Sequence, residues 1–97
     1  MELDEVPGAI AEAFDTNLVE VTHHFWDELR ADHFLLVDVR CALDNIVKVV
    51  PMGDDEVGNP KFEITGPATD SCLLGIVCSF KSTGAVLLIT VYEVNQS

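Results

Sequence analysis

The side chains that could take part in chemistry are few, and His24 is the first of them. An imidazole titrates near neutral pH, so His24 could serve as a general acid or base. It could equally be an exposed residue in the first turn of a helix, with its ring in water. Arg30 could bind a phosphate through two parallel hydrogen bonds, or it could pair with a carboxylate of its own helix such as Asp27.

A metal or cofactor site is not indicated by the spacing of the ligand-type residues. His23, His24 and Asp27 are close in sequence, but the zinc motif with two histidines at i and i+4 is absent. The cysteines are odd in number and form no CxxC pair, which disfavours a zinc site and a disulfide framework. No glycine-rich nucleotide motif or serine elbow occurs. We therefore expect no cofactor, no metal and a reducing compartment, the cytoplasm.

The charge of the chain restricts its partners. Lys and Arg number 5 against 17 Asp and Glu, which gives a net charge of −12. Nucleic-acid binders gain affinity from cationic contacts to phosphate, so DNA is excluded as a partner and tight RNA binding is disfavoured. An anionic membrane is disfavoured for the same reason. Most of the acid lies in residues 1–56, with 14 acidic and 3 basic residues. This half could be a solvated surface, or it could dock on a basic protein.

The first half of the chain is predicted to be helical. Apolar residues recur with a helical period over about 5–15, 22–32 and 36–45. Pro7 suits the first turn of the first helix, and Thr22 is a good N-cap for the second. Val39, Ala42 and Leu43 mark the apolar face of the third helix.

The second half is predicted to be a sheet, because the apolar period changes to two. Strands are expected over about 46–50, 61–65, 73–80 and 85–94, with a loop over 53–60 and a glycine break at Gly66. The 97 residues suffice for one α+β domain, residues 1–97, in which 1–21 form an N-terminal helical extension. We predict that the helices pack on one face of a four-stranded antiparallel sheet.

Residues 24–45 and 61–94 resemble a family of small bacterial domains of the RelE-like class, which shares its core with barnase, EndoU and the colicin ribonucleases. His24 falls at the histidine of the family pattern, and Asp38-Val39 falls at its Asp-Val pair. Lys61 begins the basic-aromatic pair, and residues 89–92 match the Thr-Val-Tyr-like final strand. The resemblance implies a RelE-like fold and the endoribonuclease activity of a toxin–antitoxin toxin.

The site that the resemblance implies comprises His24, Arg30, Lys61 and Tyr92, acting without a metal. A base would activate the ribose 2′-hydroxyl, and cations would stabilise the charge that develops on the phosphate. Lys61 could hold that phosphate beside His24, or it could be an exposed strand lysine. Tyr92 could supply a hydroxyl to the site, or it could be a packed tyrosine with its hydroxyl at the edge.

The chain departs from the family at the helix that is often rich in arginine. Glu28 and Asp32 stand where arginines are common, and His33 stands where a turn glycine is usual. Two hypotheses follow: an active endoribonuclease toxin, or a RelE-like domain with weak or lost activity that binds a basic protein and is a possible homodimer. In the first, the cations should converge with His24 on one concave surface. In the second, they should be scattered.

Overall fold

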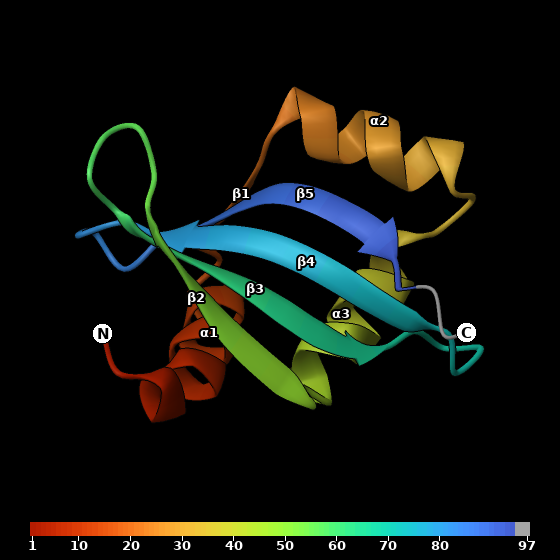
Figure 1. Ribbon diagram of the computed structural model, residues 1–97, viewed down its shortest axis with the longest axis horizontal. Coiled ribbons are helices and arrows are strands. Elements are labelled where there is room, and N and C mark those ends of the chain that lie inside the picture. Colours follow the sequence, from red (N-terminus) through yellow and green to blue (C-terminus); the bar gives the residue numbers. More distant parts are fainter. Residues whose placement is uncertain (95–97) are drawn as a thin grey trace.

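Within residues 1–94, the sheet has five strands in the order β1-β5-β4-β3-β2 (Figure 1). The computed structural model describes residues 1–94. The four strands of the second half form an antiparallel meander, whereas β1 pairs in parallel with β5. The strands are β1 (Val19–Val21), β2 (Lys48–Asp54), β3 (Pro60–Pro67), β4 (Leu73–Phe80) and β5 (Val86–Glu93).

The predicted α+β class is confirmed, but the predicted four-stranded antiparallel sheet is wrong. The prediction missed β1, which lies inside the segment 1–21 that was expected to be only a helical extension. Three residues are too few to show an alternating pattern. The strand exists because it bonds to β5: the amide of Val86 donates to the carbonyl of Leu18, and that of Thr22 donates to Leu88.

The helices begin and end close to the predicted residues. They are the short 3-10 helix η1 (Leu3–Glu5) and the helices α1 (Val6–Asp15), α2 (His23–Ala31) and α3 (Leu36–Asp44). Thr22 caps α2 by accepting a hydrogen bond from the amide of Phe25 at 3.1 Å. Helix α1 ends before Asn17 and α2 before His33, and both residues have a left-handed backbone with φ of 60°. Among residues 1–94, no helix is long and apolar enough to cross a membrane.

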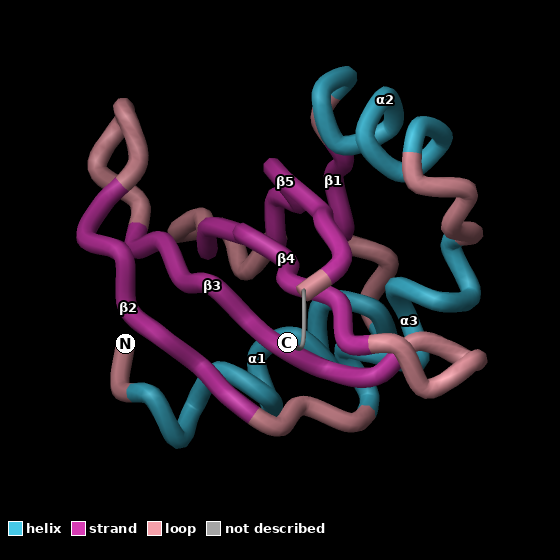
Figure 2. Tube along the Cα trace, turned by 45° about the vertical axis from the view of Figure 1, so that its right-hand side comes forward, coloured by secondary structure: helices cyan, strands magenta, loops and turns pink. Residues whose placement is uncertain are grey.

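Helices α1 and α3 share one face of the sheet, and α2 lies along its β5 edge (Figures 1 and 2). The expectation that all helices pack on one face therefore holds for two of the three. Alternate residues of β3, β4 and β5 point into the core beneath α1 and α3, as Ile64, Ile76 and Val91 do. Gly66 was predicted to break its strand, but it lies within β3. A Cβ there would be 2.1 Å from the carbonyl oxygen of Ala42, so its absence lets α3 approach the sheet.

Candidate functional site

Helix α2 covers the part of β5 that β1 is too short to reach. The hydroxyl of Thr22 donates to the carbonyl of Ile89 at 3.1 Å. Six residues further along the chain, Glu28 accepts a hydrogen bond from the amide of Val91 at 3.2 Å. Side chains of α2 thus take the place of a neighbouring strand, and they satisfy backbone groups that would otherwise lie open at a sheet edge.

His24 belongs to this edge contact. Its Nε2 lies 3.2 Å from the Glu28 oxygen that also accepts from Val91. The imidazole is 65% exposed and stands on the outer side of that carboxylate. Glu28 is therefore a structural residue, which sequence reasoning treated only as a departure from the RelE-like pattern. Its partner lies 63 residues away in sequence, so no local signal could have revealed the contact.

Arg30 forms an ion pair on the exposed side of the same helix. Its Nη2 lies 2.7 Å from the Asp27 carboxylate, and the side chains are 70% and 67% exposed. This is the helical ion pair that the sequence offered as the alternative to phosphate binding.

Tyr92 lies flat across the helix-free face of the sheet. Its ring covers Gly75, where an added Cβ would be 2.3 Å from the ring. Its hydroxyl donates to the carboxylate of Glu63 on β3 at 2.6 Å. This hydrogen bond is the main cause that raises the pKa of Tyr92 to about 12. The hydroxyl is therefore neutral and committed to a carboxylate at physiological pH.

Lys61 borders a cleft on the same face of the sheet. The cleft has a volume of about 320 Å³ and lies between the β2–β3 loop, the start of α2 and β5. Its charged lining residues are Lys61, Asp55 and Glu56. Asp55 holds the loop together, because its carboxylate accepts from the amides of Asn59 and Val57. These hydrogen bonds, chiefly that from Asn59, lower the pKa of Asp55.

The four predicted site residues do not line one cleft. None of His24, Arg30 and Tyr92 is among the residues that line the cleft of Lys61. Lys61 is opposite Ser79 on β4, whereas Tyr92 is opposite Gly75, four positions along the same strand. At ~3.3 Å per residue, this places them roughly 13 Å apart along the strand.

The five cations of the chain are scattered over the fold. Three of them form ion pairs with nearby carboxylates: Arg30 with Asp27, Arg40 with Asp44, and Lys81 with Glu20. They lie on α2, on α3 and in the turn after β4 respectively, so each neutralises a different part of the surface. The other two are Lys48 on β2 and Lys61 on β3.

Five acidic side chains on η1, on α1 and directly before η1 form no such ion pairs within residues 1–94. Glu2, Asp4, Glu5, Glu12 and Asp15 are all exposed, and none of them is ion-paired within residues 1–94. No Lys or Arg occurs before Arg30. We call these five residues the η1–α1 acidic surface.

An apolar groove with a volume of about 370 Å³ lies between the end of α1, β1 and the start of α3. Phe14, Val19, Val21, Leu36, Val37, Val39, Arg40 and Leu88 line it. We call it the β1 groove. Beside it, Leu35, Leu36 and Val37 are 65%, 47% and 58% exposed.

Sequence reasoning missed the β1 groove, although one signal was present. Val37 falls outside the helical stripe of Val39, Ala42 and Leu43, so the apolar run at the start of α3 is wider than the core needs.

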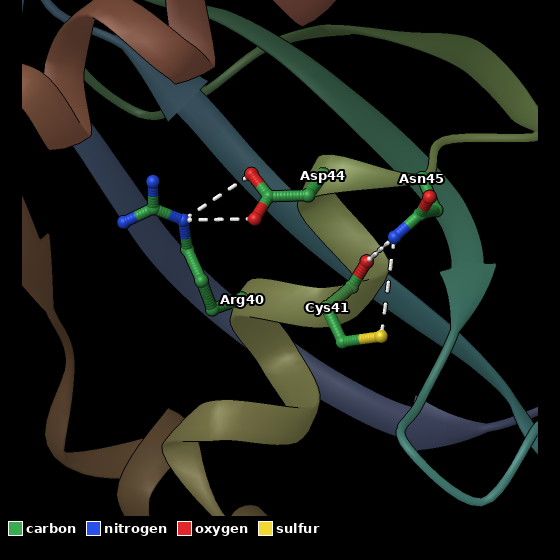
Figure 3. Close-up of polar contacts among 4 residues, drawn as sticks. All are labelled: Arg40, Cys41, Asp44 and Asn45. Atoms are coloured by element: carbon green, nitrogen blue, oxygen red, sulfur yellow. Dashed lines mark hydrogen bonds and ion pairs between the residues drawn. The ribbon is translucent and has the colours of Figure 1, made fainter.

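The only cation that lines the β1 groove is neutralised. Arg40 Nε lies 3.2 Å from one Asp44 oxygen and 3.3 Å from the other (Figure 3). The Arg40 guanidinium also lies 4.4 Å from the centre of the Phe14 ring. At the end of the same helix, the Asn45 amide donates to the carbonyl of Cys41 (Figure 3). The groove is therefore apolar and without net charge at its wall.

Comparisons of the chain with protein-family models, with curated proteins and with solved structures gave no match.

Proposed function

We propose that this chain is a protein-binding domain that docks its η1–α1 acidic surface on a basic protein and has little or no ribonuclease activity. The observation that carries the proposal is the distribution of charge. Within residues 1–94, the carboxylates on η1 and α1 form no ion pairs, whereas three of the five cations are paired with carboxylates on separate elements. Such a surface steers and orients a partner of opposite charge.

The arrangement of the candidate catalytic groups favours binding over RNA cleavage. Metal-free cleavage needs a base beside the ribose and cations that converge on the phosphate. Here His24 and Arg30 each face a carboxylate on α2, and the Tyr92 hydroxyl donates to Glu63. Lys61 shares its cleft with Asp55 and Glu56, which would repel a phosphate. The proposal includes a relationship of the fold to the RelE-like class, without the ribonuclease chemistry of that class.

Binding is tested with two variants that carry the same change in charge. The first, Asp4→Asn/Glu12→Gln/Asp15→Asn, removes three charges from the η1–α1 acidic surface. The second, Asp32→Asn/Asp54→Asn/Glu56→Gln, removes three exposed charges elsewhere. For a basic protein that co-purifies with the chain, we expect the first variant to bind at least about tenfold more weakly and the second to bind within about twofold of wild type. If the two variants lose the same binding affinity, net charge alone explains the binding, and a defined docking surface is contradicted.

Catalysis is tested on the same protein in the presence of a chelator. We expect no cleavage of single-stranded RNA at low or moderate salt. Cleavage that both His24→Ala and Lys61→Ala abolish would instead establish the endoribonuclease and overturn the proposal.

A further inference from the structure

The outer edge of β1 is free to accept another strand. The carbonyl of Leu18 and the amide of Thr22 bond to β5. Backbone groups alternate in direction along a strand, so the amides and carbonyls of Val19 and Val21 point away from β5. Strand β1 is the last strand of the sheet on this side. Within residues 1–94, no strand pairs with this edge.

The β1 groove lies directly beside that open edge. Val19 and Val21 line it from the strand, and Leu36 and Val37 line it from α3. A strand added beside β1 would place every second side chain on the face that carries the groove. Its other side chains would lie on the face of Glu20, whose carboxylate is 50% exposed and pairs with Lys81 at 2.8 Å.

We propose that this edge and groove bind an extended segment of the partner in which apolar and basic residues alternate. The backbone of the segment would bond to Val19 and Val21, and its apolar side chains would enter the β1 groove. Its basic side chains would lie on the face of Glu20, where they would compete with Lys81 for the carboxylate. The inference rests on the proposed function, and it names the form and place in which a basic partner binds.

Charge decides between such a segment and a second copy of the chain. A second copy would bring a further net charge of −12 to a chain that already carries −12. Like charges brought together at an interface weaken association, whereas a basic segment is attracted.

The test uses the peptide Lys-Val-Lys-Val-Lys-Val-Lys with the full chain. A peptide of the same composition in blocks, with four lysines followed by three valines, serves as the charge control. We expect amide chemical shifts to change at residues 18–22 and 35–40. Binding of the block peptide should be at least about tenfold weaker, because it matches the charge but not the alternation.

Two variants test the groove and the edge separately. Val37→Asp puts a charge into the groove at an exposed position, and Val21→Pro removes an amide that β5 does not use. We expect each to weaken binding of the alternating peptide at least about tenfold. The matched control is Val57→Asp in the β2–β3 loop, 81% exposed and outside the groove, which should stay within about twofold of wild type.

The outcomes separate this inference from the proposed function. If the chemical shifts change only at the η1–α1 acidic surface, the peptide does not bind in the β1 groove. Equal binding by Val37→Asp and Val57→Asp would lead to the same conclusion. Either result would contradict this inference without contradicting the proposed docking through the η1–α1 acidic surface. If neither peptide binds and the two charge variants also show no difference in binding, both this inference and the proposed function are contradicted. Sedimentation as a dimer that Val37→Asp dissociates would overturn the inference in favour of a second copy.

Discussion

At the scale of single residues, the carboxylates of this protein hold its backbone in place. Glu28 accepts from Val91, and Asp38 accepts from the amides of Leu35 and Thr69 and from the Thr69 hydroxyl. The sequence identified the reactive side chains and the local Arg30–Asp27 pair, but not distant partners such as Glu63, which lies 29 positions from Tyr92. Residue type predicted what each group could do, and tertiary contacts determine what it does.

Asp38 makes the stability of the protein depend on pH in the acidic range. Its hydrogen bonds, chiefly that from the Thr69 hydroxyl, lower its pKa below the ordinary value of 3.8. The stabilisation is therefore present above that value and is lost as the pH falls through the lower pKa of the folded state. We expect Asp38→Asn to cost about 1–2 kcal/mol at pH 7. Urea unfolding at pH 7 and pH 2.5 measures this cost, and an equal cost at both pH values would contradict the assignment.

Tyr92 can be titrated directly, because it is the only tyrosine in the chain. The raised pKa, about 12 against an ordinary 10.0, means that its contribution to stability is lost as pH rises through this range. Absorbance of the phenolate should therefore show a midpoint near 12 in the folded protein and near 10 in urea. Glu63→Gln should move the folded midpoint towards the urea value. An unchanged midpoint would show that Glu63 is not the cause.

At the scale of elements, the sequence predicted what local signals encode. Thr22 and Pro7 located helix starts, and the apolar run at 73–80 located β4. Strand β1 and the role of α2 as an edge cover could not be predicted in the same way. Both depend on β5, which lies more than sixty residues further along the chain.

The end of α2 is strained at His33. Its amide donates to Arg30, the amide of Phe34 donates to Leu29, and φ at His33 is 60°. Glycine adopts this left-handed cap without strain, so we expect His33→Gly to raise stability by up to about 1 kcal/mol. Asn17→Gly, at the equivalent position after α1, should gain less because asparagine tolerates this backbone. Thermal unfolding of the two variants makes the comparison, and a loss of stability in His33→Gly would contradict it.

The contact between α3 and β3 depends on the missing side chain at Gly66. An added Cβ would meet the backbone carbonyl of Ala42, which cannot move without shifting the helix. We expect Gly66→Ala to destabilise the fold by about 2–4 kcal/mol. Gly8→Ala is the control, since nothing lies within 4 Å of its added Cβ and alanine favours a helix. Denaturant unfolding measures the free energy of unfolding of both variants. Equal values for Gly66→Ala and Gly8→Ala would contradict the close contact at Gly66.

At the scale of the whole molecule, charge is the dominant property. The total of −12 predicts a basic partner, and that partner stays a prediction. The fold adds that the cations are dispersed and that, within residues 1–94, the η1–α1 acidic surface has no ion pairs. The same charge opposes the compact state through self-repulsion.

Salt should therefore stabilise this protein. Repulsion between exposed carboxylates is screened as the Debye length falls from about 30 Å at 0.01 M to about 8 Å at 0.15 M salt. We expect the melting temperature to rise over this range of sodium chloride. The gain should be smaller in Asp4→Asn/Glu12→Gln/Asp15→Asn, which has less charge to screen. A melting temperature that falls with salt in wild type would show that attractive pairs dominate instead.

The parallel pairing of β1 with β5 also sets the order in which the protein can be completed during synthesis. Val19 is made well before its partner Val86. The antiparallel strands β2 to β5 can pair with neighbours as they appear, whereas β1 must wait until β5 has been made. Until then Val6 and Ile10, which are buried in the finished core, lack much of their cover. The growing chain thus carries these uncovered apolar residues until β5 has been made, and this is the stage at which aggregation or a chaperone competes with folding.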